Sequence, residues 1–220
     1  WIGILGNVTT LCDNTTVNGT QIENVGYAMM ANETESIRML RTYDSDYVLV
    51  YVVAQIELSS AGGLTGNVTF AGFGDEGKWA WMARISGGAQ DRFLDEGFMT
   101  DTYKWTNELD FGNSSRLGYD FNDTNTNGQI DQGELIPNAM GQNSLIYKLM
   151  TYAVQQWAIA NGFGTAQTPV APQFFTPAYI AGLEVPYDQI NSLQYRGLIP
   201  LVALYKINYD AYNNATSTSP

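Results

Sequence analysis

Oxygen-bearing side chains recur through the segment Asp123–Glu134 at the spacing of a calcium-binding loop of about twelve residues. Gly128 stands where such a loop turns sharply, and Ile130 stands where an apolar side chain anchors it. We expect a structural Ca²⁺ ion in a loop without a full pair of flanking helices; an Asn/Asp-rich turn without metal is the alternative. The expected ligands are Asp123, Asn125, Asn127, Gln129 through its backbone carbonyl, Asp131 and Glu134.

A second group, Asp75, Lys78 and Met82, has helical spacing. If Asp75 caps a helix over about 75–86, Lys78 and Met82 lie one turn apart on one face, and Ile85 continues the stripe. An acid, a base and a thioether on one face could form a recognition surface. Taken alone, these residues favour the plainer interpretation, a capped helix that packs against a core.

Composition narrows the classes of function. The chain has no histidine, which removes the most common general base and the most common zinc ligand. Its single cysteine, Cys12, cannot form an internal disulfide bond and is expected to be a small buried hydrophobe. The net charge of −12 disfavours a nucleic acid partner, because phosphates would be repelled. Since the chain starts at Trp1 without an initiator Met, we expect a fragment of a larger protein.

The chain is also rich in Asn-x-Ser/Thr sequons, more than its content of Asn, Ser and Thr would give by chance. Such an excess indicates a surface that meets the N-glycosylation machinery, hence an extracytoplasmic location. The alternative is that Asn- and Thr-rich loops generate sequons freely. The sequons begin at Asn7, Asn14, Asn18, Asn32, Asn67, Asn113, Asn122 and Asn214.

Hydrophobic patterning predicts the elements that must position these groups. We expect loop over 1–25, two short helices or one broken helix over 26–42, and a buried strand over 46–54. A Gly-rich segment over 59–74 then leads into the helix at 75–86. The clearest helix covers 141–161, with Asn143 or Ser144 as its cap, and a strand at 198–209 should pair with 46–54.

These elements predict a mixed α/β class, with a central core of helices around a small sheet and an inserted or peripheral Pro/Gly-rich lobe. The core, with the helix at 75–86 and the calcium loop, should span 1–162, and the lobe 163–197. A returning core strand should occupy 198–212, and a disordered tail 213–220.

Parts of the chain resemble the C-terminal globular domain of the oligosaccharyltransferase catalytic subunit, the STT-three and AglB family. Residues 1–52 are similar to the segment that follows the family's Trp-Trp-Asp-Tyr-Gly signature, and Asp75-x-x-Lys78-x-x-x-Met82 resembles its DK motif. Weaker likenesses lie at 144–150 and 204–207. The signature itself, which in the family binds the hydroxyl at the +2 position of the acceptor sequon, is missing.

The resemblance implies transfer of a lipid-linked oligosaccharide to Asn of Asn-x-Ser/Thr in an acceptor polypeptide. Met82 would touch the methyl group of a +2 Thr, while Asp75 and Lys78 would fix the helix and orient the missing signature. The catalytic carboxylates and their Mg²⁺ or Mn²⁺ would lie in an absent N-terminal multi-span membrane domain, so the fragment has no catalytic residue and should be inactive alone. The implied location is the extracellular face of a membrane. The low fraction of charged residues and the absence of disulfide bonds suit an archaeal surface enzyme.

A different class remains open, a secreted calcium-stabilised surface or adhesion module without catalysis. The composition and the Asp123–Glu134 loop support it equally well. A stand-alone hydrolase has little support, because no acid pair can be placed from the sequence.

Overall fold

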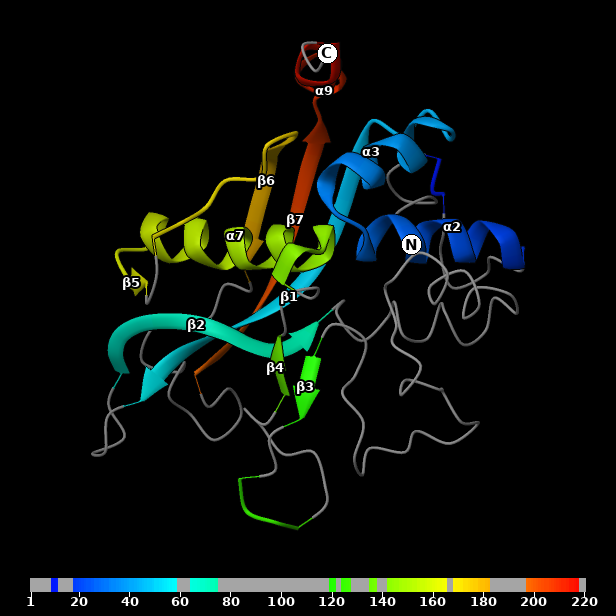
Figure 1. Ribbon diagram of the computed structural model, residues 1–220. Coiled ribbons are helices and arrows are strands. Elements are labelled where there is room, and N and C mark those ends of the chain that lie inside the picture. Colours follow the sequence, from blue (N-terminus) through cyan, green and yellow to red (C-terminus); the bar gives the residue numbers. More distant parts are fainter. Residues whose placement is uncertain are drawn as a thin grey trace.

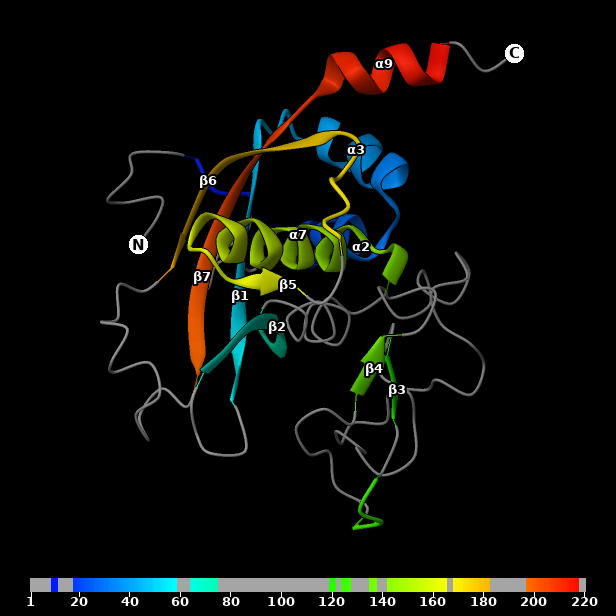
Figure 2. The same cartoon turned by 90° about the vertical axis from the view of Figure 1, so that its left-hand side faces the viewer.

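The centre of the protein is a twisted sheet with helices on one face (Figures 1 and 2). The structure is a computed structural model, and it describes residues 9–11, 18–58, 64–74, 119–121, 124–127, 135–137, 142–165, 168–182 and 197–217. Over these residues the strand order is β5-β2-β1-β7-β6, antiparallel except for the β2–β5 pair. The mixed α/β class expected from the sequence is confirmed. The strands are β1 (Tyr47–Leu58), β2 (Leu64–Gly74), β5 (Gly164–Thr165), β6 (Phe175–Gly182) and β7 (Leu198–Ile207).

The β1–β7 pair forms the middle of the sheet. It runs without interruption from Tyr47 opposite Lys206 to Gln55 opposite Leu198, so the predicted pairing of these two segments is confirmed. Alternate residues of β1, such as Val50 and Val52, are fully buried on the helix side. The intervening residues Tyr47, Leu49 and Tyr51 are exposed on the other face, because side chains of a strand alternate between its two faces, whereas Val53 is buried there. The first half of β1 is therefore buried on one face only, although its continuous apolar run is typical of a strand buried on both.

Two helices precede β1, α2 (Gly19–Met30) and α3 (Glu33–Arg41), which confirms the predicted pair of short helices. α2 begins earlier than expected because the Asn18 side chain accepts a hydrogen bond from the backbone N–H of Gln21 at 3.2 Å and caps the helix. The break falls where Asn32 caps α3 in the same way, accepting from the N–H of Glu35 at 3.1 Å.

Helix α7 (Leu145–Ala160) lies across the sheet and supplies much of the core. Ser144 is its N-cap, as expected, and accepts from the N–H of Tyr147 at 3.4 Å. Leu149 and Ala153 are fully buried against the strands. The hydroxyl of Tyr205 on β7 donates to the backbone carbonyl of Leu149 at 2.6 Å, and burial raises the pKa of that hydroxyl.

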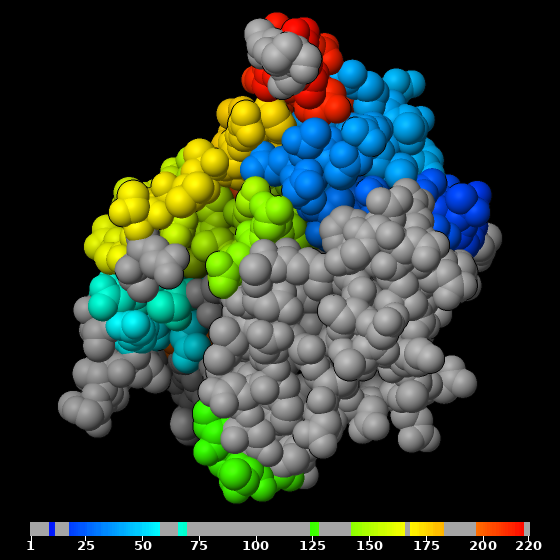
Figure 3. Space-filling model, viewed as in Figure 1, coloured from blue at the N-terminus to red at the C-terminus, as the bar shows by residue number. Residues whose placement is uncertain are grey.

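Two stretches differ from the sequence expectations. β2 continues the sheet over residues in the segment expected to be Gly-rich loop, because Val68 and its neighbours pair with β1, and tertiary pairing outweighs the weak strand preference of glycine. Helix α9 (Tyr209–Ser217) occupies part of the 198–212 strand and most of the expected disordered tail, and it protrudes beside α3 (Figure 3).

The range 163–197, expected to be a separate lobe, includes β5 and β6, both of which belong to the main sheet. Residues 183–196 lie outside the described residues, so the lobe stays a prediction. A second, two-stranded sheet pairs β3 (Tyr119–Phe121) with β4 (Leu135–Pro137). Within the described part of the chain, no helix has both the length and the apolar character that crossing a bilayer requires.

Candidate functional site

The expected acceptor residues Asp75, Lys78 and Met82 lie outside the described residues. The structure does show what precedes them. β2 ends at Gly74, whose partner on the central strand is Val52. The sheet therefore carries the chain up to the residue before Asp75.

The expected calcium loop is described only in part. Asp123, Gln129, Asp131 and Glu134 fall outside the described residues, whereas Asn125 and Asn127 are described and exposed. No cluster of three or more His, Cys, Asp or Glu side chains occurs among the residues that the structure describes.

Strands, and not helices, flank this loop. Phe121 of β3 pairs with Leu135 of β4, so the two ends of the intervening segment are held side by side. Within it, the side-chain oxygen of Asn125 accepts from the N–H of Asn127 at 3.0 Å, and Thr126 has a φ of 56°. A tight turn with two amide side chains two residues apart could place oxygen atoms around one hard cation.

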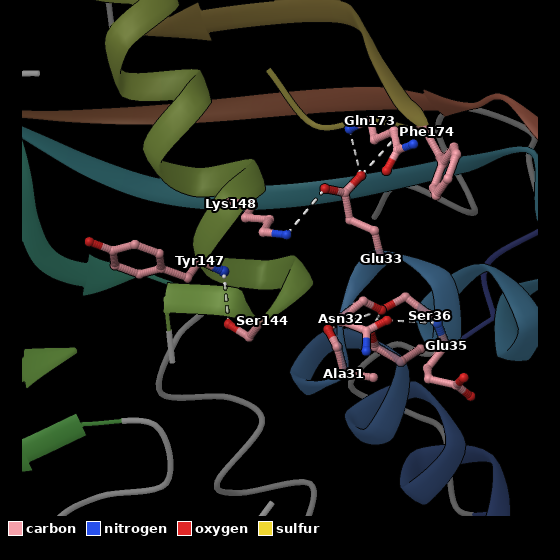
Figure 4. Close-up of polar contacts among 11 residues, drawn as sticks. Ala31, Asn32, Glu33, Glu35, Ser36, Ser144, Tyr147, Lys148, Gln173 and Phe174 are labelled. Atoms are coloured by element: carbon pink, nitrogen blue, oxygen red, sulfur yellow. Dashed lines mark hydrogen bonds and ion pairs between the residues drawn. The ribbon is translucent and has the colours of Figure 1, made fainter. Parts of the chain in front are cut away.

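Glu33, buried to 7% exposure, is the centre of a polar cluster that sequence reasoning missed. One carboxylate oxygen accepts from the backbone N–H groups of Gln173 at 2.7 Å and Phe174 at 3.1 Å. The other lies 3.4 Å from the Nζ atom of Lys148 on α7 (Figure 4). We call these four residues the Glu33 anchor, which joins α3, α7 and the start of β6.

A second contact strengthens this junction. The backbone N–H of Leu145 donates to the carbonyl of Ala31 at 2.8 Å, which connects the first turn of α7 to the break between α2 and α3. The hydroxyl of Ser36 donates to the carbonyl of Asn32 at 2.8 Å and to the carbonyl of Ala28. The α2–α3 pair is thus fixed on α7 by hydrogen bonds as well as by apolar packing.

Arg41 at the end of α3 holds α9. Its guanidinium carbon lies 4.9 Å from the ring centre of Tyr209 and 5.1 Å from that of Tyr212. It also donates to the side-chain oxygen of Asn213 at 2.8 Å. The Tyr209 hydroxyl donates to the carbonyl of Ser45 at 2.7 Å, and burial raises the pKa of this hydroxyl although the Arg41 charge opposes the shift.

The polar clusters just described are structural. Glu33 and Lys148 form an ion pair, and the carboxylate also accepts from two backbone amides, so both side chains join elements of the fold. Arg41 is engaged by two rings and an amide. What these residues do is position elements: the sheet, whose β2 leads to Asp75, and the helix layer packed on it.

The fold is a mixed α/β domain whose described polar clusters hold it together, and its likeness to known proteins is local. No family model matches the chain. Over 87 residues, 40% of the chain, it is 44% identical to the dolichyl-diphosphooligosaccharide–protein glycosyltransferase subunit STT3 of Saccharomyces cerevisiae, covering 10% of that protein. It is 38% identical over 87 residues, again 40% of the chain and 10% of the relative, to subunit STT3B of Oryza sativa subsp. japonica. The subunit STT3 of Dictyostelium discoideum is 31% identical over 100 residues, 46% of the chain and 12% of the relative.

The chain therefore contains a region related to STT3 subunits. It spans about a tenth of the length of the curated relatives that it matches.

Proposed function

We propose that this chain is part of an oligosaccharyltransferase catalytic subunit, where it helps to recognise the acceptor sequon. The observation that carries the proposal is the local identity to the STT3 subunits of yeast, rice and a slime mould. By the names of these relatives, the reaction is transfer of an oligosaccharide from a dolichyl diphosphate to a protein. This local identity favours a transferase over the alternative, a secreted calcium-stabilised surface module.

In this proposal Asp75, Lys78 and Met82 form one wall of the acceptor pocket. Met82 contacts the methyl group of a Thr at the +2 position, and Asp75 and Lys78 orient the neighbouring backbone. The position of β2 supports this assignment up to the preceding residue, because Gly74 is paired with Val52 of the central strand. The bond-making carboxylates and their Mg²⁺ or Mn²⁺ belong to a membrane domain outside this chain, and the lipid-linked oligosaccharide binds there.

The same proposal places the chain on the extracellular face of a membrane, joined in the full-length protein to a multi-span domain. The sequon-rich surface supports this location. The single cysteine and the charged fraction of only 15% support an archaeal surface enzyme.

The test is acceptor preference in the full-length protein. Met82→Ala removes the contact with a methyl group that is worth about 0.8 kcal/mol, so the preference for Asn-x-Thr over Asn-x-Ser peptides should fall about fourfold in kcat/KM. Lys78→Ala should weaken the use of both peptides. Lys206→Ala is the matched control, because it removes an exposed positive charge from β7. Unchanged kinetics in both Met82→Ala and Lys78→Ala would exclude the assignment.

We also propose that the Asp123–Glu134 segment binds a structural Ca²⁺ ion, distant from the catalytic metal. The Asn125 turn and the β3–β4 pairing support it, because the pairing brings the two ends of the segment together and the Asn125 side-chain oxygen accepts from the N–H of Asn127 in a tight turn between them. The ion would complete the loop with carboxylates from Asp123, Asp131 and Glu134.

A further inference from the structure

Four sequons fall on described residues, those that begin at Asn18, Asn32, Asn67 and Asn214, and all four asparagines are exposed. Exposure alone does not distinguish them. An N-linked sugar is attached to the Nδ2 atom of the side chain. The four sites therefore differ in whether this atom already donates a hydrogen bond within the fold.

In Asn67 on β2, the Nδ2 atom is already hydrogen-bonded. This atom donates to a carboxylate oxygen of Glu57 on the neighbouring strand at 3.1 Å. The Oδ1 atom of Asn67 covers Gly164 so closely that a Cβ atom added to that glycine would lie 2.6 Å away. A sugar on Asn67 would disturb a side chain that is held on both sides.

Asn214 lies within α9, where the backbone is helical. The hydroxyl of its +2 residue, Thr216, donates to the carbonyl of Tyr212 at 3.0 Å. Both ends of this sequon are thus part of the helix. Asn18 caps α2 with an extended backbone, φ −79° and ψ 105°, and its Oδ1 atom accepts from the N–H of Gln21 at 3.2 Å.

Asn32 differs from Asn67 and Asn214, and it caps its helix as Asn18 does. It stands before the first turn of α3 with an extended backbone, φ −66° and ψ 166°. Its Oδ1 atom caps the helix by accepting from the N–H of Glu35 at 3.1 Å, while within the described part of the chain its Nδ2 atom has no hydrogen-bond partner. A sugar on Nδ2 leaves Oδ1 free to cap, so glycosylation and folding do not compete at this residue.

We infer that Asn32 carries an N-linked oligosaccharide, with Thr34 as the hydroxyl residue of its sequon. The inference rests on the proposed function, which brings this surface to the side of the membrane where the donor is used. The donor is a lipid-linked oligosaccharide diphosphate. The bond from the anomeric carbon to the diphosphate oxygen breaks, and its electron pair leaves with the lipid diphosphate. The anomeric carbon bonds to Nδ2, which gives up one proton to a base of the transferase.

The Glu33 anchor indicates whether the sugar is transferred before or after α3 docks on α7. Glu33 is the middle residue of the sequon, and in the folded protein its carboxylate is held by Lys148 and by two backbone amides (Figure 4). The sequon cannot leave the helix start without breaking these contacts. Transfer therefore precedes the docking of α3 on α7, and the sugar then remains on the exposed Asn32.

The experiment is peptide mapping of the full-length protein purified from its own membranes. Amidase release of the sugar in ¹⁸O-labelled water converts each glycosylated Asn to labelled Asp, which mass spectrometry locates. We expect labelling at Asn32 and less at Asn67 in the folded protein, because a sugar added to Asn67 before folding would prevent its contact with Glu57 and fewer such chains would fold. An unlabelled Asn32 would overturn the inference, whether or not other sequons are occupied. Equal labelling of Asn32 and Asn67 would overturn the argument from Nδ2.

Variants of Thr34 and Asn32 distinguish the glycosylation of Asn32 from its role as a helix cap. Thr34→Ser should keep the label, and Thr34→Ala should lose it. Asn32→Asp should also lose the label without lowering the melting temperature of the deglycosylated protein, since Asp caps as well as Asn. Acceptor-peptide kinetics measured on the same preparations keep the two proposals apart. An unlabelled Asn32 with a Met82-dependent Thr preference overturns only this inference, whereas a labelled Asn32 without that preference overturns only the proposed function.

Discussion

Glu33 illustrates how one side chain can join three elements. Its partners are distant in sequence: Lys148 is 115 residues away, and Gln173 is 140 residues away. No local pattern could have predicted these contacts, because a glutamate in the first turn of a helix is ordinarily exposed and interacts favourably with the helix dipole. The caps at Asn32 and Ser144, by contrast, act within three residues, and Ser144 is one of the two alternatives, Asn143 or Ser144, that were expected for the cap of α7.

Replacing Glu33 by alanine should be strongly destabilising. The N–H groups of Gln173 and Phe174 would lose their acceptor; that of Phe174 is buried, and an unsatisfied buried group costs about 1–3 kcal/mol, whereas that of Gln173 is only partly buried. We expect Glu33→Ala to lower the free energy of unfolding by about 2–4 kcal/mol in urea titrations. Lys148→Met is the matched variant. It breaks only the ion pair, whose lysine is 31% exposed, and should cost no more than about 1 kcal/mol. Equal effects of the two variants would mean that the ion pair, and not the two amides, stabilises the junction.

At the scale of elements, the sequence predicted the segments with clear apolar patterns, including the paired strands β1 and β7, and missed β2 and α9, whose patterns are weak. The helix pair before β1, the long α7 and the β1–β7 pairing follow from hydrophobic patterning and capping residues. β2 was not predicted, because its glycines have a weak strand preference and its pairing with β1 is not visible in the local sequence. α9 was not predicted either, because it has no fully buried residue and is held by a contact with α3.

Loss of the Arg41 side chain should release α9. The guanidinium interacts with the rings of Tyr209 and Tyr212, and a cation–π contact at an exposed site is worth about 0.5–1 kcal/mol. In Arg41→Ala, amide hydrogen exchange over 212–217 should accelerate severalfold, with little change in α7. Arg38→Ala is the control, because its pairing with Glu35 at 3.0 Å lies within α3 and does not reach α9. If exchange in α9 were the same in both variants, the Arg41 contact would not be what holds this helix.

The calcium loop is an element whose flanks were not predictable from its motif. The spacing of oxygen side chains predicts ligands, whereas the β3–β4 pairing that joins the ends depends on residues outside the motif. Chelation of Ca²⁺ should lower the melting temperature of the unchanged protein, since binding to the folded state alone stabilises it. In the variant with Asp123→Ala and Glu134→Ala, chelation should change nothing. A chelation effect of the same size in both proteins would exclude calcium at this loop.

On the scale of the whole molecule, the described residues of the sheet and its helix layer form one core. The fully buried residues of β1, β7 and α7 lie in one cluster. The sequence could predict this core, because apolar patterning determines which strands and helices face one another. It could not predict the geometry of the acceptor wall. That wall depends on Asp75, Lys78 and Met82, which lie outside the described residues, and on a signature that the chain does not contain.

The proposed division between acceptor recognition in this chain and catalysis elsewhere leads to a prediction for the isolated chain. Given a lipid-linked oligosaccharide, Mn²⁺ and an acceptor peptide, it should transfer no sugar. Its assigned residues only bind the acceptor, and the charged groups of its described anchors, Glu33, Lys148 and Arg41, are already engaged in structural contacts. The full-length protein in the same assay is the positive control, and circular dichroism with a cooperative melt establishes that the isolated chain is folded. Transfer by the isolated chain would place the bond-making groups within these 220 residues and would contradict the proposed division between recognition and catalysis.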